Sequence, residues 1–181
     1  MENSHHPVIL ELRAARDDLR AAWDSVPAAA RHRAPVPGAW TPAEVLEHLA
    51  RTLGQVVRLA EALWAGRSED LPRAPGGADA PSPASRLDAH RVEDRSERFA
   101  APDFALPDRG QLPEESWDQL AAGWERLVAL AASVAGYDTS SLRAPHPFLG
   151  VLDLEQWLLF AAKHERRHTA QLREAAEALR R

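Results

Sequence analysis

The chain of 181 residues is long enough for one domain that buries roughly 70% of its unfolded surface. Its composition is 45% hydrophobic and 27% charged, and abundant alanine and leucine favour helices over sheet. A net charge of −5 without a cluster of lysine or arginine argues against nucleic acid as a partner, and zero cysteines rule out disulfides. No signal sequence and no apolar run of about 20 residues is visible. We therefore expect one all-α domain over residues 1–181, cytoplasmic and with no membrane partner.

A first helix is predicted from Pro7 to about Ser25, where Pro27 ends it. Its apolar residues recur at steps of three and four, which places them on one face of a helix. These residues are Ile9, Leu12, Leu19 and Trp23, and Arg16 completes the series between Leu12 and Leu19, with a stem that can cover the edge of the face. We interpret this segment as a packing helix that carries no chemistry.

The second helix is predicted from Thr41 to about Ala65, and its start is well marked. Thr41 can cap the helix, Pro42 suits its first turn, and Glu44 completes a capping box. His48 falls at or beside the apolar seam of this helix. A lone histidine at such a position is more often structural than a ligand.

Residues 66–112 form a long crossover that is rich in proline and glycine. Seven of the 14 prolines lie between Gly66 and Pro113, so one long helix cannot cross the stretch. A connection of this length inside a compact domain either is mobile or covers a site. We expect residues 66–99 to be mobile without substrate, because their charges, prolines and glycines leave little apolar surface to hold them.

The third helix is predicted from Pro113 to Gly136, with Trp117 and Trp124 among its core residues. A turn-rich segment follows, in which two prolines flank His146 and restrict it to an extended loop. His146 either donates a hydrogen bond near a site or lies on the surface.

The fourth helix begins after Asp153, which can cap it with Gln156 as the reciprocal partner. His164 and His168 lie four residues apart on its apolar stripe, so both imidazoles are expected to point inward. The stripe consists of Trp157, Ala161, His164, His168, Leu172, Ala175 and Leu179.

Two histidines one turn apart have Cβ atoms roughly 5–6 Å from each other. Because imidazole nitrogens bind zinc-like metals at about 2.0–2.1 Å, one ion can accept both. The alternative is a pair of hydrogen-bonded core histidines. If the second and fourth helices are neighbours, His48 joins His164 and His168, and three imidazoles leave a position open for water or a ligand. Imidazole suits zinc, nickel, iron or copper, and among these divalent transition metals we expect zinc or nickel, with iron as an alternative.

Several short motifs occur in a fixed order along the chain. They are Trp40-Thr41-Pro42, Glu47-His48-Leu49, His146-Pro147 with Gly150, and Trp157 followed by His164-Glu165-Arg166-Arg167-His168 and Gln171. Together they resemble the DinB/YfiT-like superfamily of four-helix metalloproteins, over nearly the whole chain. The resemblance implies a four-helix bundle with a long crossover between helices two and three. It also implies a three-histidine metal site, carried over onto His48, His164 and His168.

The resemblance also implies a range of activities on small-molecule substrates. Members of the superfamily include S-transferases and isomerases that use bacillithiol, mycothiol or glutathione, together with metal-dependent hydrolases. Our leading interpretation is an S-transferase in which the metal binds an external thiol, because coordination lowers the pKa of a thiol. Such thiols carry carboxylates, for which Arg166, Arg167 and Arg98 are candidate partners.

Two alternatives stay open. A hydrolase would need a base beside a water of lowered pKa, and the candidates are Glu165, Glu44 and His146. A non-enzymatic stress-response protein would use the metal for stability alone. The sequence also leaves open whether two chains form a homodimer.

Overall fold

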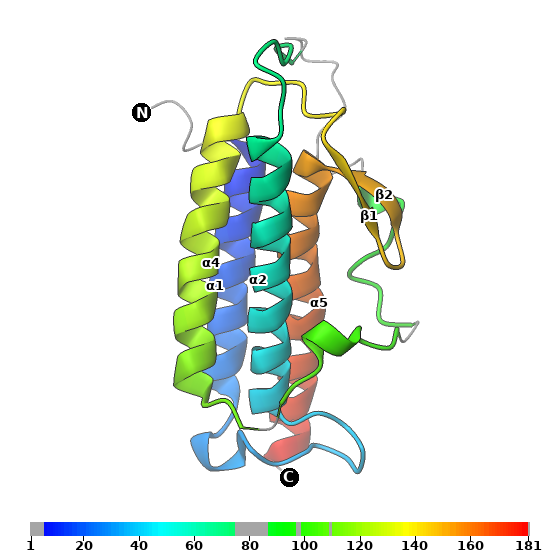
Figure 1. The fold of residues 1–181 in the computed structure, drawn as a ribbon. Coiled ribbons are helices and arrows are strands. Elements are labelled where there is room, and N and C mark those ends of the chain that lie inside the picture. The colour runs from blue at the N-terminus through cyan, green and yellow to red at the C-terminus, as the bar shows by residue number, and fades with distance from the viewer. Residues whose placement is uncertain (1–5, 75–86, 97–98, 109, 181) are drawn as a thin grey trace.

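The computed structural model describes residues 6–74, 87–96, 99–108 and 110–180 (Figure 1). Its four long helices are α1 (Pro7–Ser25), α2 (Pro42–Ala65), α4 (Pro113–Val134) and α5 (Leu154–Leu179). They lie side by side as a bundle, in which α5 packs on α1 and α2 while α4 packs on α2 and α1 (Figure 1). The predicted four-helix bundle, with its long crossover between the second and third long helices, is confirmed.

Local capping fixes the start of the two histidine-bearing helices. At α2 the Thr41 hydroxyl accepts from the Glu44 amide at 3.1 Å, and the Glu44 carboxylate accepts from the Thr41 amide at 2.8 Å. At α5 the Asp153 carboxylate and the Gln156 side chain form the same reciprocal pair, at 2.9 and 3.0 Å. Both boxes were predicted. They satisfy amides that would otherwise lack partners and so set where each helix begins.

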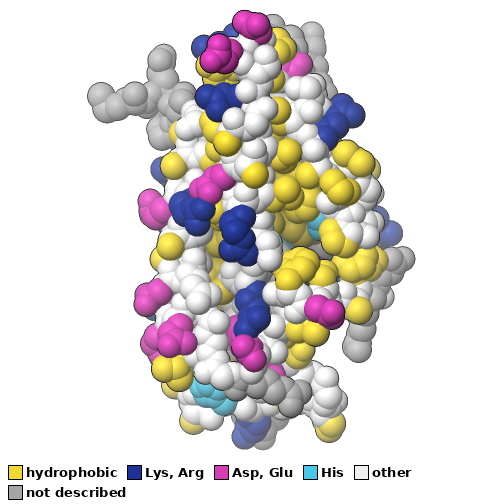
Figure 2. Space-filling model, viewed as in Figure 1, with side chains coloured by type: hydrophobic (Ala, Val, Ile, Leu, Met, Phe, Trp, Pro, Cys, Tyr) yellow, Lys and Arg dark blue, Asp and Glu magenta, His cyan; other side chains and the backbone are white. Residues whose placement is uncertain are grey.

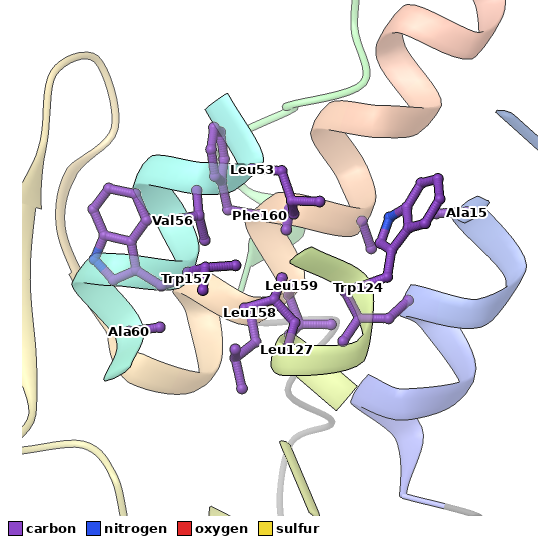
Figure 3. Packing of buried hydrophobic residues seen from close by; sticks show 14 of the residues in the cluster. Ala15, Leu53, Val56, Ala60, Trp124, Leu127, Trp157, Leu158, Leu159 and Phe160 are labelled. Atoms are coloured by element: carbon purple, nitrogen blue, oxygen red, sulfur yellow. The ribbon is translucent and has the colours of Figure 1, made fainter. Parts of the chain in front are cut away.

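The bundle interior is one continuous apolar cluster to which all four helices contribute (Figure 3). Leu127 of α4 and Leu158 of α5 are fully buried within it, and each contributes on the order of 2 kcal/mol by leaving water. The helices α2 and α4 approach closely at Gly123, where an added Cβ would lie 2.6 Å from the Leu53 side chain. This packing makes α2 and α5 rigid supports for side chains at their edge.

A small hairpin precedes α5, where only an extended loop was expected. Its strands are β1 (Arg143–His146) and β2 (Gly150–Asp153), antiparallel, with His146 opposite Gly150. The fold is therefore mostly helical, with one two-stranded hairpin that the all-α prediction did not include. Pro145 and Pro147 argued against a strand here, because proline is disfavoured in the interior of a sheet. In a two-stranded ribbon both strands are edge strands, and an edge strand tolerates proline.

The described parts of the crossover lie against the bundle. Leu87 is fully buried and Val92 is buried in the main core cluster. A 3-10 turn, η3 (Asp103–Ala105), then packs on α2. The expectation of little buried apolar surface over residues 66–99 is therefore wrong at Leu87 and Val92. The mobility of this segment stays a prediction, and part of it lies outside the described residues.

A second 3-10 turn, η2 (Ala28–Ala30), lies in the connection between α1 and α2.

Among the described helices, we found none with a stretch long and apolar enough to cross a lipid bilayer.

Candidate metal centre

The bundle brings the three predicted histidines together. His48 comes from the second turn of α2, and His164 and His168 from consecutive turns of α5. One ring nitrogen from each lies within 4.8 Å of the others, and the Nε2 atoms of His48 and His164 are 3.4 Å apart. Two imidazoles bound to one tetrahedral ion at about 2.0–2.1 Å would have their nitrogens about 3.3 Å apart. The arrangement therefore fits a metal ion.

Hydrogen bonds to the outer nitrogens set the tautomers of two of these rings. Nδ1 of His48 donates to the carbonyl oxygen of Ala105 in η3 at 2.8 Å. Nδ1 of His168 donates to the Gln171 amide oxygen at 2.8 Å. Because each Nδ1 carries the proton, each Nε2 presents a lone pair to the cluster. Outer acceptors of this kind orient metal-binding histidines and increase their basicity as ligands.

Burial keeps the cluster neutral. His48 is 4% exposed and His168 is 9% exposed. Burial lowers the pKa of His48, and burial together with the nearby His168 and His48 rings lowers the pKa of His164 well below its usual value. For His168, burial and then His48 lower the pKa to about 3. Neutral imidazole is the form that binds a metal, so no proton must leave at neutral pH.

Glu47 tethers the crossover beside the cluster. This buried carboxylate accepts from the amide of Asp108 at 2.8 Å and from Nε of Arg51 at 2.9 Å. The Arg51 guanidinium also pairs with the Asp108 side chain at 3.1 Å. The network holds the chain just after Ala105, whose carbonyl is the acceptor of His48. No role was predicted for Glu47, although its position next to the inward-facing His48 indicates a buried acid near the site.

His146 lies one aromatic ring away from the cluster. Its ring centroid is 4.5 Å from that of Phe160, which in turn lies 5.3 Å from that of His164. Nδ1 of His146 accepts from the backbone amides of Phe148 and Leu149, both at 3.2 Å. Burial, with a smaller repulsion from His90, lowers the pKa of His146 to about 4. The ring is therefore neutral at pH 7 and carries its proton on Nε2.

The two other candidate bases face different partners. Glu165 is buried, and its Oε1 accepts from Nε1 of Trp124 on α4 at 2.5 Å, while Oε2 has no partner among the described residues. Burial raises the pKa of Glu165 to about 8. Glu44 belongs to the capping box at the start of α2. The bundle thus turns the Glu165 carboxylate toward α4 and uses Glu44 at a helix end.

The candidate thiol-binding arginines hold other parts of the chain. Arg166 forms an ion pair with Glu11 of α1 at 2.5 Å. Arg167 donates to the carbonyl oxygens of Val92 and Asp94, so it fastens the crossover beside the histidines. Arg98 lies outside the described residues.

Figure 2 shows a hollow beside α2, bordered by hydrophobic side chains, with a histidine side chain visible inside it. The hairpin and the crossover lie on this side of the bundle (Figure 1). The hydrophobic border of this hollow therefore lies on the side of the bundle where the hairpin and the crossover pack.

The sequence of residues 11–172 matches the family model described as the DinB superfamily. The matched region includes all three histidines and most or all of each long helix. Comparisons with curated proteins and with solved structures gave no significant match. The chain belongs to the DinB superfamily, and it carries a buried cluster of three histidines that could bind a metal.

Proposed function

We propose that the protein is a metal-dependent S-transferase that joins a low-molecular-weight thiol to a small organic electrophile. The convergence of His48, His164 and His168 supports this proposal, because three neutral imidazoles leave a coordination position open. A bound divalent ion, zinc or nickel in our expectation, would supply a Lewis acid that lowers the pKa of a thiol from about 8.5. Bacillithiol, mycothiol and glutathione are the candidate thiols.

The surroundings of the histidines favour a thiol over water as the nucleophile. Glu165 accepts from Trp124, Glu44 completes a capping box, and the lone pair on Nδ1 of His146 accepts two backbone amides. Glu165 therefore faces α4, Glu44 is used at a helix end, and the lone pair of the neutral His146 ring is already engaged. A thiolate of lowered pKa needs no such base at neutral pH.

The reaction is a transfer of sulfur to carbon. The thiol gives its proton to solvent, and its sulfur forms a new bond to the electrophilic carbon. The displaced electron pair moves to a leaving group or onto a conjugated oxygen. The three histidines would hold the ion that binds the sulfur, because α2 and α5 fix their rings and Ala105 and Gln171 orient two of them.

Cobalt substitution tests the proposal directly. We expect a sulfur-to-cobalt charge-transfer band when one of the three thiols is added to the cobalt-loaded protein. His168→Ala should abolish the band. His32→Ala, which changes an exposed histidine in the α1–α2 connection, should leave it intact. If no thiol at millimolar concentration gives the band, and activated esters are hydrolysed in a His168-dependent way, a hydrolase replaces the S-transferase.

A further inference from the structure

A series of aromatic ring contacts leads from the histidines to the surface. It begins with Phe160, whose ring contacts both His164 and His146. From His146 it continues to Phe148 in the hairpin turn, with ring centroids 6.1 Å apart. Phe148 then contacts Phe99 of the crossover, with centroids 5.2 Å apart. The series therefore connects the histidine cluster, through the buried Phe160 ring, to aromatic rings at the surface.

The outer end of this series is exposed to an unusual degree for phenylalanine. Phe99 is 53% exposed and Phe148 is 48% exposed, although the two rings touch. They come from segments far apart in the sequence, and both segments lie on the side of the bundle where Figure 2 shows the hollow with its hydrophobic border. Binding sites for organic ligands are lined mainly by hydrophobic and aromatic side chains with a small number of placed polar groups.

His146 adds one polar atom to this apolar surface. Its Nδ1 accepts from the amides of the hairpin turn, so the proton of the neutral ring is on Nε2, at the opposite edge. Nε2 makes no hydrogen bond to a described residue, and it is not among the polar atoms sealed in the interior. It is therefore available as a hydrogen-bond donor to a ligand.

We propose that this aromatic surface binds the electrophile of the S-transferase reaction. The ligand is a flat, conjugated molecule that lies against Phe99 and Phe148, and its carbonyl or nitro oxygen accepts a hydrogen bond from Nε2 of His146. The chemistry of the substrate rests on the proposed function, but its binding requires neither thiol nor turnover.

The same donor has a role in the bond-forming step with an unsaturated carbonyl compound. The thiolate sulfur bonds to the β carbon, and the π electrons move onto the carbonyl oxygen. Nε2–H of His146 stabilises the charge that develops there. The proton that the thiol released returns from solvent to the α carbon. His146 acts as a donor and keeps its own proton.

Two matched amides provide a test on the zinc-loaded full chain without thiol. Benzamide is flat and conjugated, whereas cyclohexanecarboxamide has a similar size and the same amide but a puckered ring. Titration followed by nuclear magnetic resonance should show benzamide binding at least about threefold more tightly, as expected for aromatic stacking. The nitrogen resonance of His146 Nε2 should be that of a protonated nitrogen before benzamide is added. Its chemical shift should change when benzamide binds.

Variants locate the binding. Phe99→Ala and Phe148→Ala should each weaken benzamide about threefold to tenfold. Leu10→Ala is the matched control, because Leu10 is equally exposed at 48% but lies on α1. His146→Asn should weaken benzamide to a similar degree, since asparagine can accept from the same turn amides but has no donor at the Nε2 position.

Equal affinity for the two amides would overturn the inference. So would a proton on Nδ1 of His146, or phenylalanine variants that behave like Leu10→Ala. The cobalt experiment separates this result from the proposed function. If the charge-transfer band is absent while benzamide binds as described, the S-transferase fails and the aromatic site stands. If the band is present while benzamide fails, only the present inference is lost.

Discussion

Helix α5 carries two buried polar clusters that begin one residue apart. His164 and His168 face α2 and meet His48, whereas Glu165 meets Trp124 of α4. At the first cluster, the tautomers of His48 and His168 direct lone pairs toward each other. At the second, an indole donor meets an oxygen of a carboxyl group. Burial is similar at both, so the difference lies in how donors and acceptors match.

That difference separates a binding site from a structural contact. The Nε2 lone pairs of His48 and His168 converge with a nitrogen of His164, and an electron-pair acceptor such as a metal ion can satisfy all three. In the second cluster the Trp124 indole donates to a Glu165 oxygen, so this donor and this acceptor satisfy each other. The neighbouring tryptophans pack around the pair. Trp117 packs against Trp124 with ring centroids 5.8 Å apart and against Trp23 at 6.3 Å. We infer that the first cluster depends on a ligand, whereas the second supports the fold.

The largest expected effect follows from removing a ligand. His48→Ala, His164→Ala and His168→Ala should each raise the metal dissociation constant by more than about a hundredfold, since even the loss of a group that only orients a ligand costs about ten- to hundredfold. Helical circular dichroism should survive, because the core is elsewhere. Metal analysis of protein purified without a nickel column measures the effect. Full retention of one metal per chain in His48→Ala would break the three-ligand site.

Glu165 provides the opposite case. Glu165→Ala should lower the free energy of unfolding by about 2–3 kcal/mol, because it leaves the buried Trp124 indole without its acceptor. Glu165→Gln keeps an acceptor oxygen and should cost much less. Both variants should keep the metal content of the wild type. Urea unfolding measures the stability of each variant, and metal analysis measures its metal content. If Glu165→Gln bound less metal than the wild type, Glu165 would belong to the metal site and the two clusters would not differ as described.

Much of this architecture could be predicted because its determinants are local. The capping boxes at Thr41 and Asp153 lie within four residues, and the inward placement of His48, His164 and His168 follows from helical periodicity. The meeting of those histidines required only that α2 and α5 be neighbours, which the family resemblance implied.

The remaining features depend on which element covers which face. The sequence places Glu165 on α5 but does not say that Trp124 lies opposite, and it does not pair Glu47 with the distant amide of Asp108. The crossover was expected to be loose because its own composition is polar. Its described part is held by Lys163 and Arg167 of α5, a helix that follows it in the sequence.

A smaller effect should come from the tether around His48. Glu47→Ala removes the acceptor of the Asp108 amide, which loosens the segment that carries the Ala105 carbonyl. We expect the metal dissociation constant to rise about tenfold with stoichiometry preserved. Glu61→Ala is the control, since Glu61 also lies on α2 and pairs with Arg126. Equal affinities in the two variants would show that the crossover does not support the metal site.

The smallest effect concerns pH and His146. In the folded protein the pKa of His146 is lowered to about 4 by burial and by repulsion from His90, whereas an unfolded chain protonates near its usual value of 6.5. The unfolded state therefore gains a proton first as pH falls, and this residue reduces stability progressively from pH 6.5 toward 4. Asparagine does not titrate, so His146→Asn should lose less stability than the wild type over that window.

Urea unfolding at about pH 7 and about pH 5 measures this slope for each protein. The comparison uses the change between the two pH values, so a constant loss from the altered ring packing cancels. The metal-binding histidines contribute the same slope to both proteins. His90→Asn should show part of the same reduction, because it removes the smaller of the two causes. A steeper slope in His146→Asn than in the wild type would mean that His146 is charged in the folded protein and is not the neutral donor described above.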